Sequence, residues 1–160
     1  MLKVTDKYVI FFKEWPSNFQ YSPFTTEGLN FSWVEQYFMW KKAITFNDDV
    51  IAKMILLAQS PQQARSLGRK VRGYDDVVWA GIREQVMKEG SLLKYRQNPK
   101  LRSLLTAQEY IEKHYVEANP YDTIWSVGVD KEKAVDPNNW RGQNKLGHTL
   151  DKVRQILISE

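Results

Sequence analysis

The chain has 160 residues, of which 42% are hydrophobic and 26% are charged, as in an ordinary globular protein of one domain. Its formal net charge of +4 favours anionic partners, either a phosphorylated metabolite or a nucleic acid. There is no cysteine and there are only two histidines, so disulfides, thiolate nucleophiles and metal centres are not expected. A signal peptide and a membrane-length apolar run are also absent, and we expect a cytoplasmic protein without a cofactor or a membrane partner.

The first half of the chain opens with a strand signal and continues with helix signals. Residues 7–12 (KYVIFF) are β-branched and aromatic, which predicts a strand. The next segment, residues 14–31, is punctuated by proline and glycine and predicts an ordered loop or a hairpin. Apolar spacing and cap residues then predict helices over residues 31–46, 48–59 and 60–68, the last with Ser60 as its N-cap.

The second half is also mostly helical in its pattern. Helices are predicted over residues 75–90, 91–98 and 98–108, and the first of them carries an apolar stripe of Val78, Ile82 and Val86. The remaining elements are a strand over residues 110–118, a turn-rich loop with a strand-like tail over 119–130, and a helix over 142–159. These patterns predict a single α+β domain, dominated by helices and containing a small β-sheet.

An acidic and a basic residue share one face of the helix predicted over residues 31–46. Glu35 and Lys42 are seven positions apart, which nearly closes two helical turns and separates them by about 10.5 Å along the axis. Phe38 and Met39 lie between them on that face. Solvent exposure is the commoner role for Glu and Lys on helices. A catalytic carboxylate in a half-dry site lined by aromatic rings is the alternative.

Three further segments could contribute to a site. Trp79 lies at core spacing in its helix, where packing is the usual role of a tryptophan. Asp122 lies in the loop after a predicted strand, where polar groups tend to face clefts, although an Asx-type turn would also explain it. The segment from Arg141 to Asn144 offers a guanidinium and amides beside a helix N-terminus, which suits an anion, although capping alone would explain Asn144.

Several catalytic motifs are missing from the sequence: GxxxxGK[ST], GxGxxG, HExxH and GxSxG. The groups that remain available for catalysis are carboxylates, lysine and aromatic rings. These groups suit hydrolysis of a glycosidic bond, because a carboxylate can stabilise an oxocarbenium-like transition state and position water. A flat base can stack on tryptophan, and lysine or arginine can hold a phosphate.

Seven segments of the chain resemble, in order, the motifs of the NADAR family, also called YbiA-like. They are PSNFQYSPF, FSWVEQYFMWKKA, SPQQARSLGR, VVWAGIREQVM, LKYRQNPKLRSLLTA, VEANPYDTIWSVG and GQNKLGHTLDKVR. The resemblance covers nearly the whole chain and implies a helix-rich domain that hydrolyses N-glycosidic bonds. The family activities include cleavage of ribosylaminopyrimidine phosphates of riboflavin biosynthesis and removal of ADP-ribose from guanine in DNA.

The resemblance also implies roles for individual residues. Catalytic roles fall on Glu35, as the key carboxylate, and on Lys42 and Asp122. Glu35 could act as a base, a nucleophile or an electrostatic stabiliser. Substrate-binding roles fall on Asn18, Arg69, Trp79, Trp125, Gln143 and Asn144. In a departure from the family pattern, Ser126 replaces the glycine that usually follows the loop tryptophan, which predicts a tighter or differently turned backbone.

The resulting hypothesis is an N-glycosidase that acts on a phosphorylated riboside. A closely related alternative is hydrolysis of ADP-ribosyl-guanine in nucleic acid, which the basic residues around Arg69 would suit. A non-catalytic module that binds ADP-ribose or NAD-like ligands is the alternative from a different class, because it would need the rings and cations but no carboxylate.

Overall fold

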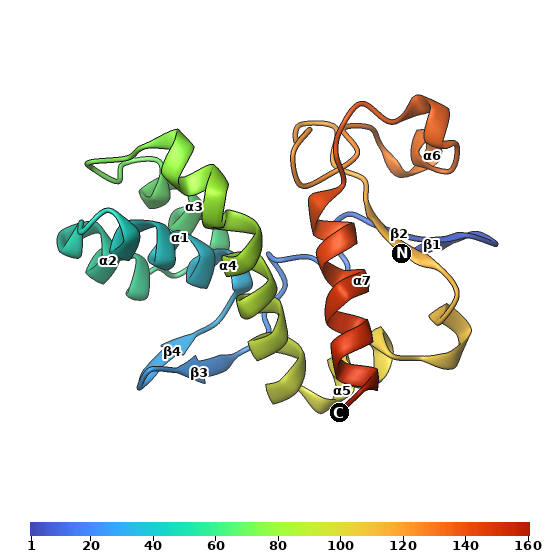
Figure 1. Ribbon diagram of the computed structural model, residues 1–160, viewed down its shortest axis with the longest axis horizontal. Helices are drawn as coiled ribbons and strands as arrows, with labels where there is room; N and C mark the ends of the chain where they lie inside the picture. Colours follow the sequence, from blue (N-terminus) through green and yellow to red (C-terminus); the bar gives the residue numbers. More distant parts are fainter. The chain divides into compact units, whose positions relative to one another are not determined.

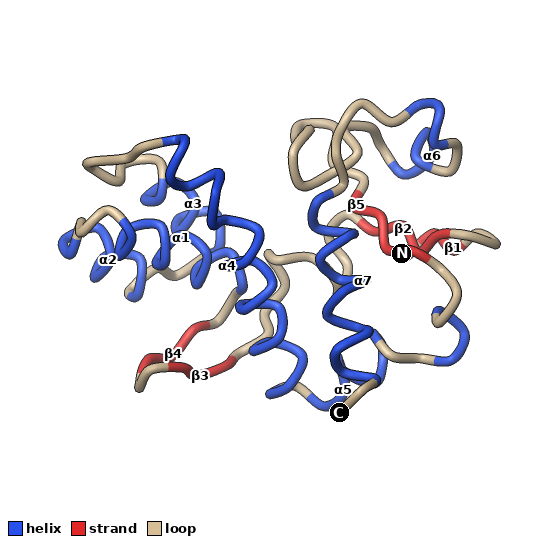
Figure 2. The backbone as a smooth tube through the Cα atoms, in the orientation of Figure 1, coloured by secondary structure: helices blue, strands red, loops and turns tan.

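The computed structural model describes residues 1–160, and the chain divides into two compact units (Figure 1). Unit 1 comprises Met1–Gln20 and Pro99–Glu160, and unit 2 comprises Tyr21–Asn98. Helices dominate and the sheets are small, which confirms the expected α+β class (Figure 2). No helix combines the length and the apolar composition needed to cross a membrane. The single domain expected over residues 1–160 stays a prediction.

Unit 2 is built around one helix whose surface is almost entirely covered. Its elements are β3 (Phe24–Thr26), β4 (Leu29–Phe31), α1 (Val34–Thr45), α2 (Asp49–Leu56), α3 (Pro61–Gly68) and α4 (Asp76–Gln97). Every residue of α1 from Val34 to Trp40 is buried, because α2, α3, α4 and β4 all pack against this helix. A helix covered on all sides can hold a polar group away from bulk water, and Glu35 and Gln36 are buried in this way.

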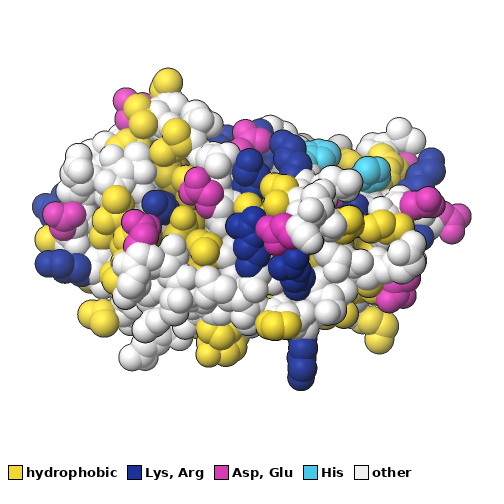
Figure 3. Space-filling view, turned by 60° about the horizontal axis from the view of Figure 1, so that its bottom comes forward, with side chains coloured by type: hydrophobic (Ala, Val, Ile, Leu, Met, Phe, Trp, Pro, Cys, Tyr) yellow, Lys and Arg dark blue, Asp and Glu magenta, His cyan; other side chains and the backbone are white.

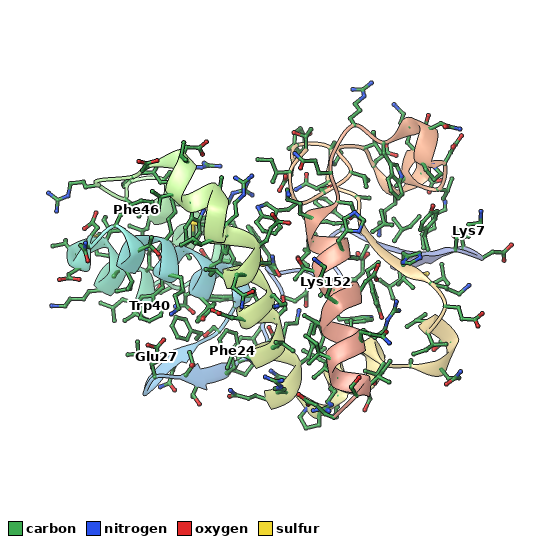
Figure 4. The ribbon with its side chains drawn as sticks, viewed as in Figure 1. Lys7, Phe24, Glu27, Trp40, Phe46 and Lys152 are labelled. Carbon is green, nitrogen blue, oxygen red and sulfur yellow. The ribbon has the colours of Figure 1, made fainter.

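The hairpin formed by β3 and β4 covers one face of α1 through aromatic rings. Phe24 and Phe31 pair across the hairpin with ring centroids 5.6 Å apart. Phe31 also contacts Tyr37 and Trp40 of α1, at 5.3 Å in both cases. Figure 4 labels Phe24 and Trp40 in this cluster. The aromatic residues of the α1 segment therefore serve mainly as core on this side, as their buried area favours.

Helix α4 corrects two predictions. The segments 75–90 and 91–98 form one continuous helix, and Gly90 is a position where α4 packs closely against α1. A Cβ at Gly90 would lie 2.8 Å from the ring of Tyr37, so the glycine allows close packing rather than ending the helix. The predicted apolar stripe is also wrong in part: Val78 and Ile82 are exposed, because the buried face of α4 runs through Trp79 and Val86 instead.

Unit 1 combines a three-stranded sheet with helices and long loops. Its elements are β1 (Lys3–Val4), β2 (Tyr8–Phe11), α5 (Pro99–Leu105), η1 (Gln108–Tyr110), β5 (His114–Glu117), α6 (Lys131–Ala134), η2 (Pro137–Asn139) and α7 (Lys145–Ile158). The strand order is β1-β2-β5, with β1 antiparallel to β2 and β2 parallel to β5. The predicted strands are present but shorter, and the strand-like tail near residue 130 is loop leading into α6 (Figure 2).

The sheet of unit 1 is covered on both faces, since Val9, Ile10 and Phe11 of β2 are all fully buried. One core cluster contains Ile10, Val116, Ala118, Val127, Val129 and Ala134. Helix α7 packs along β5, and its first turn lies very close to the strand. A Cβ at Gly147 would lie 2.0 Å from the carbonyl oxygen of Tyr115, so this position has no room for a side chain.

Replacing Gly147 by alanine is therefore expected to lower the free energy of unfolding by about 2 kcal/mol, because backbone must shift to make room. Gly81 provides the matched control, since a Cβ there meets nothing within 4 Å. In this exposed position on α4, Gly81→Ala should raise the free energy of unfolding by about 1 kcal/mol. Urea denaturation followed by circular dichroism measures both changes. Equal effects of the two substitutions would contradict the close α7–β5 packing.

Candidate functional site

One face of α1 carries an acidic and a basic side chain in a largely buried setting. Glu35 lies in the first turn of the helix and is 9% exposed, and Lys42 lies in the last turn and is half-buried. The two side chains are close enough for the charge of Glu35 to raise the pKa of Lys42. The shared face that the seven-residue spacing predicted is thus present, and Glu35 does not lie in bulk solvent.

The ammonium of Lys42 is held by a carbonyl group and an aromatic ring. Its Nζ donates a hydrogen bond of 2.9 Å to the carbonyl oxygen of Gly68 and lies 4.6 Å from the centre of the Tyr74 ring. Burial lowers the pKa of Lys42, the carboxylate of Glu35 raises it, and the guanidinium of Arg69 lowers it. Glu35, Lys42 and Arg69 therefore form one electrostatic group, which we call the α1 site.

The close approach of α3 to α1 creates the contact between Lys42 and Gly68. A Cβ at Gly68 would lie 2.0 Å from Sδ of Met39, so only glycine fits without displacing that side chain. Helix α3 is well defined at its start, where Ser60 Oγ accepts from the backbone N–H of Gln63, as the predicted N-cap requires. The end of α3 therefore presents its Gly68 carbonyl to α1 from a fixed direction.

Residues 69–75 follow α3 and pass over the C-terminal end of α1. We call this segment the strap. Asp48 fixes it at one point, because its buried carboxylate accepts from the backbone N–H of Arg72 at 2.8 Å. Phe46 fixes it at another, with its ring 5.4 Å from that of Tyr74. Asp75 then caps α4 by accepting from two backbone N–H groups. Arg69, Lys70 and Arg72 are exposed along the strap.

Trp79 lies beside the α1 site as a packed side chain. It is 4% exposed and its ring is 5.1 Å from that of Phe38, which is one turn after Glu35 on α1. At this position the Trp79 side chain can keep water away from the face of α1 that carries Glu35. Because the ring is packed, little of its surface is left for stacking on a base. Of the predicted site residues, unit 2 thus brings together Glu35, Lys42, Arg69 and Trp79.

The other predicted site residues belong to unit 1, where two loops pair through their backbones. Residues 123–127 accept hydrogen bonds from the backbone N–H groups of residues 141–146, including Gln143 N–H to Thr123 O and Leu146 N–H to Trp125 O. Gly142 allows this pairing, since a Cβ there would lie 2.1 Å from the carbonyl oxygen of Ser126. The paired loops bring Asp122, Trp125, Gln143 and Asn144 into one region of unit 1.

Asp122 has the hydrogen bonds of a loop-stabilising residue. Its Oδ1 accepts from the backbone N–H groups of Ile124 and Trp125, both at 2.9 Å, which is the Asx-type arrangement. Ser126, which is fully buried, links the loop further by donating to the carbonyl of Glu117 and accepting from the N–H of Asn119. The backbone of Ser126 is not left-handed, so this position does not require glycine.

The structure corrects the predicted capping role of Asn144. Its side chain makes no cap hydrogen bond. It instead bridges to β5, where it accepts from Glu117 N–H at 3.1 Å and donates to Tyr115 O at 3.0 Å. The backbone of Asn144 is left-handed, with φ of 52°. Gln143 is exposed, and Asn18 is buried in the N-terminal loop.

Sequence reasoning did not single out three side chains that the structure makes notable. Glu117 is a largely buried carboxylate at the end of β5, where the paired loops begin. Lys94 is buried in α4, and Tyr74 contacts Lys42. Glu117 and Lys94 both lie within the family-like segments, but nothing local in their patterns indicates burial. Tyr74 follows a glycine in a basic loop, and its sequence pattern indicates an ordinary turn residue.

The surface charge is mixed rather than segregated. In the view of Figure 3, Lys and Arg side chains alternate with Asp and Glu and with hydrophobic patches. The net charge of +4 therefore gives a modest positive field, and the strap is the segment where exposed cations lie closest together in sequence.

The helix-dominated α+β architecture agrees with the fold that the resemblance implied. The match to the NADAR domain family model extends over residues 2–158, and the chain belongs to the NADAR family. The matched range includes residues of both units.

Named relatives and a solved structure agree with this assignment. N-glycosidase R617 of Acanthamoeba polyphaga mimivirus is 35% identical over 94% of this chain and 96% of its own length. Protein irg-1 of Caenorhabditis elegans is 38% identical over 81% of this chain and 62% of its own. The NMR structure of E. coli YbiA superposes with a TM-score of 0.79 at 26% identity, covering 98% of this chain and 88% of that one.

Proposed function

We propose that this chain hydrolyses the N-glycosidic bond of a phosphorylated riboside in the cytoplasm, with Glu35 as the key carboxylate. The chain is an N-glycosidase of the NADAR family, a hydrolase, as are relatives that carry that name. The observation that supports the finer proposal is the α1 site: a carboxylate that is 9% exposed lies within electrostatic range of the half-buried Lys42, which is also within range of Arg69.

The chemistry assigned to Glu35 follows from the transition state. When the bond from C1′ to the base nitrogen breaks, its electron pair leaves with the base and positive charge develops on the sugar. A carboxylate with little access to water stabilises that charge more strongly than an exposed one would. Water then adds to C1′ and gives a proton to the departing base, which completes the hydrolysis.

The two cations of the α1 site suit the phosphate of the substrate. Lys42 and Arg69 together carry two positive charges and can donate charge-assisted hydrogen bonds to phosphate oxygens. Lys42 has spare donors for this purpose, since an ammonium has three and the carbonyl of Gly68 takes one. Among phosphorylated ribosides, we propose ribosylaminopyrimidine phosphates, the riboflavin-pathway intermediates implied by the resemblance.

The test compares release of free base and sugar from a panel of ribosides. Purified protein should hydrolyse ribosylaminopyrimidine 5′-phosphate, and removing the phosphate should lower kcat/KM by about 10- to 100-fold, because charge-assisted hydrogen bonds are lost. Equal turnover of the dephosphorylated riboside would refute the assignment of Lys42 and Arg69 to phosphate.

The same panel of substrates distinguishes the proposed function from two alternative functions. An oligonucleotide carrying ADP-ribosyl-guanine tests hydrolysis on nucleic acid, which the exposed Arg69, Lys70 and Arg72 of the strap favour. Preferred cleavage of this substrate, with affinity that falls steeply as salt rises, would replace the free riboside by a nucleic-acid substrate. Binding of ADP-ribose without any cleavage of the panel would instead indicate a non-catalytic module.

A further inference from the structure

Tyr74 is more exposed than a core residue and yet is fixed from several sides. The residue is 42% exposed, and its ring packs edge-on against Phe46, with the two ring planes inclined by 62°. Its hydroxyl donates a hydrogen bond of 2.7 Å to Oδ1 of Asp76, in the first turn of α4. An exposed ring held at both its edge and its hydroxyl has a defined orientation, and its neighbour in that orientation is Lys42.

The ring of Tyr74 supplies a contact that the rest of the α1 site does not. Lys42 has a flexible four-carbon stem, and its one hydrogen bond in the structure goes to the neutral carbonyl of Gly68. A single acceptor fixes the distance of an ammonium group but leaves its direction free. The negative face of the ring, 4.6 Å from Nζ, constrains the ammonium from a second direction.

We propose that Tyr74 is a positioning residue, whose ring face holds the ammonium of Lys42 beside Glu35 and Arg69 so that Lys42 can engage the anionic group of the substrate. This inference rests on the function proposed above. The ring suits this task better than a carboxylate would, because it attracts the ammonium without neutralising the charge that the phosphate must meet.

The inference is tested with two variants that separate the ring from the hydroxyl. Tyr74→Phe keeps the ring face and loses only the hydrogen bond to Asp76. Tyr74→Leu keeps an apolar cover over Lys42 and loses the ring face. We expect Tyr74→Leu to lower kcat/KM on the phosphorylated riboside by about 5-fold, whereas Tyr74→Phe stays within about 2-fold of wild type.

A second readout does not depend on activity. The pKa of Lys42, followed by NMR on lysine labelled at Cε and assigned with Lys42→Arg, should fall by about half a pH unit in Tyr74→Leu. The fall is expected because leucine keeps the burial that disfavours charge and removes the ring face that favours it. Tyr74→Phe should leave this pKa unchanged. If Tyr74→Leu melts early, Tyr74→Met takes its place in the titration.

Unchanged kinetics together with an unchanged pKa of Lys42 in Tyr74→Leu would overturn the inference. Equal losses in the phenylalanine and leucine variants would also overturn it, because the hydroxyl rather than the ring would then be responsible. If wild-type protein cleaves no riboside, the proposed function fails, and the titration of Lys42 still decides whether the ring holds the ammonium.

Discussion

Glu35→Gln is expected to lower kcat on the phosphorylated riboside by about 10²- to 10⁴-fold, the range typical of losing a catalytic acid or base. Glutamine preserves the size of the side chain and removes its charge, so packing in the middle of unit 2 should be kept. Because the carboxylate acts on charge that develops in the transition state, kcat and kcat/KM should fall together. Steady-state kinetics with the ribosylaminopyrimidine phosphate measures both parameters.

Two comparisons make this result interpretable. Glu112→Gln removes an exposed carboxylate from unit 1 and should leave turnover unchanged. The pKa of Lys42 should fall in Glu35→Gln, because the carboxylate that raises it is gone, and this change shows that the variant is folded with the α1 site intact. Turnover within about 3-fold of wild type, together with a lowered pKa of Lys42, would refute the catalytic role of Glu35.

The free energy of unfolding of Lys94→Met, taken relative to wild type, is expected to decrease as the pH rises above neutral. Lys94 is 1% exposed in α4, and burial lowers its pKa from 10.5 to about 7. Between these two values the unfolded chain binds the proton and the folded chain does not, so the wild-type free energy of unfolding rises with pH. Below pH 7 the folded protein carries a buried charge, and the cost is then largest.

The free energy of unfolding of Lys94→Met relative to wild type should therefore fall by about 2 kcal/mol between pH 7 and pH 9, since each unit of pKa difference corresponds to about 1.4 kcal/mol. Urea denaturation at several pH values measures this difference. Lys88→Met, the same substitution at a partly exposed position of the same helix, is the matched control. A constant difference between Lys94→Met and wild type across this range would mean that the buried amine does not titrate with a lowered pKa.

Local sequence signals predicted the parts of the fold that depend on local physics. The N-cap at Ser60, the hairpin around Gly28 and helices α1, α2 and α3 follow from capping, turn chemistry and periodicity. The Glu35–Lys42 face could be predicted as well, because a seven-residue spacing fixes the relative direction of two side chains on any helix.

The remaining features depend on partners that are distant in the sequence. Strands β2 and β5 pair in register across about a hundred intervening residues, which no local pattern encodes. Gly90 looked like a helix end, and only the ring of Tyr37 shows that it is a packing position. The burial of Lys94 and the bridge from Asn144 to β5 are likewise tertiary effects. They override the usual preferences of lysine for the surface and of asparagine for helix caps.

The most direct measurement quantifies both products after wild-type protein is incubated with ribosylaminopyrimidine 5′-phosphate. The account predicts that free base and ribose 5-phosphate form in equal amounts, and that the substrate is recovered intact with Glu35→Gln. Intact substrate recovered from the wild-type protein, alongside clear binding by calorimetry, would contradict the account and make the chain a binding module.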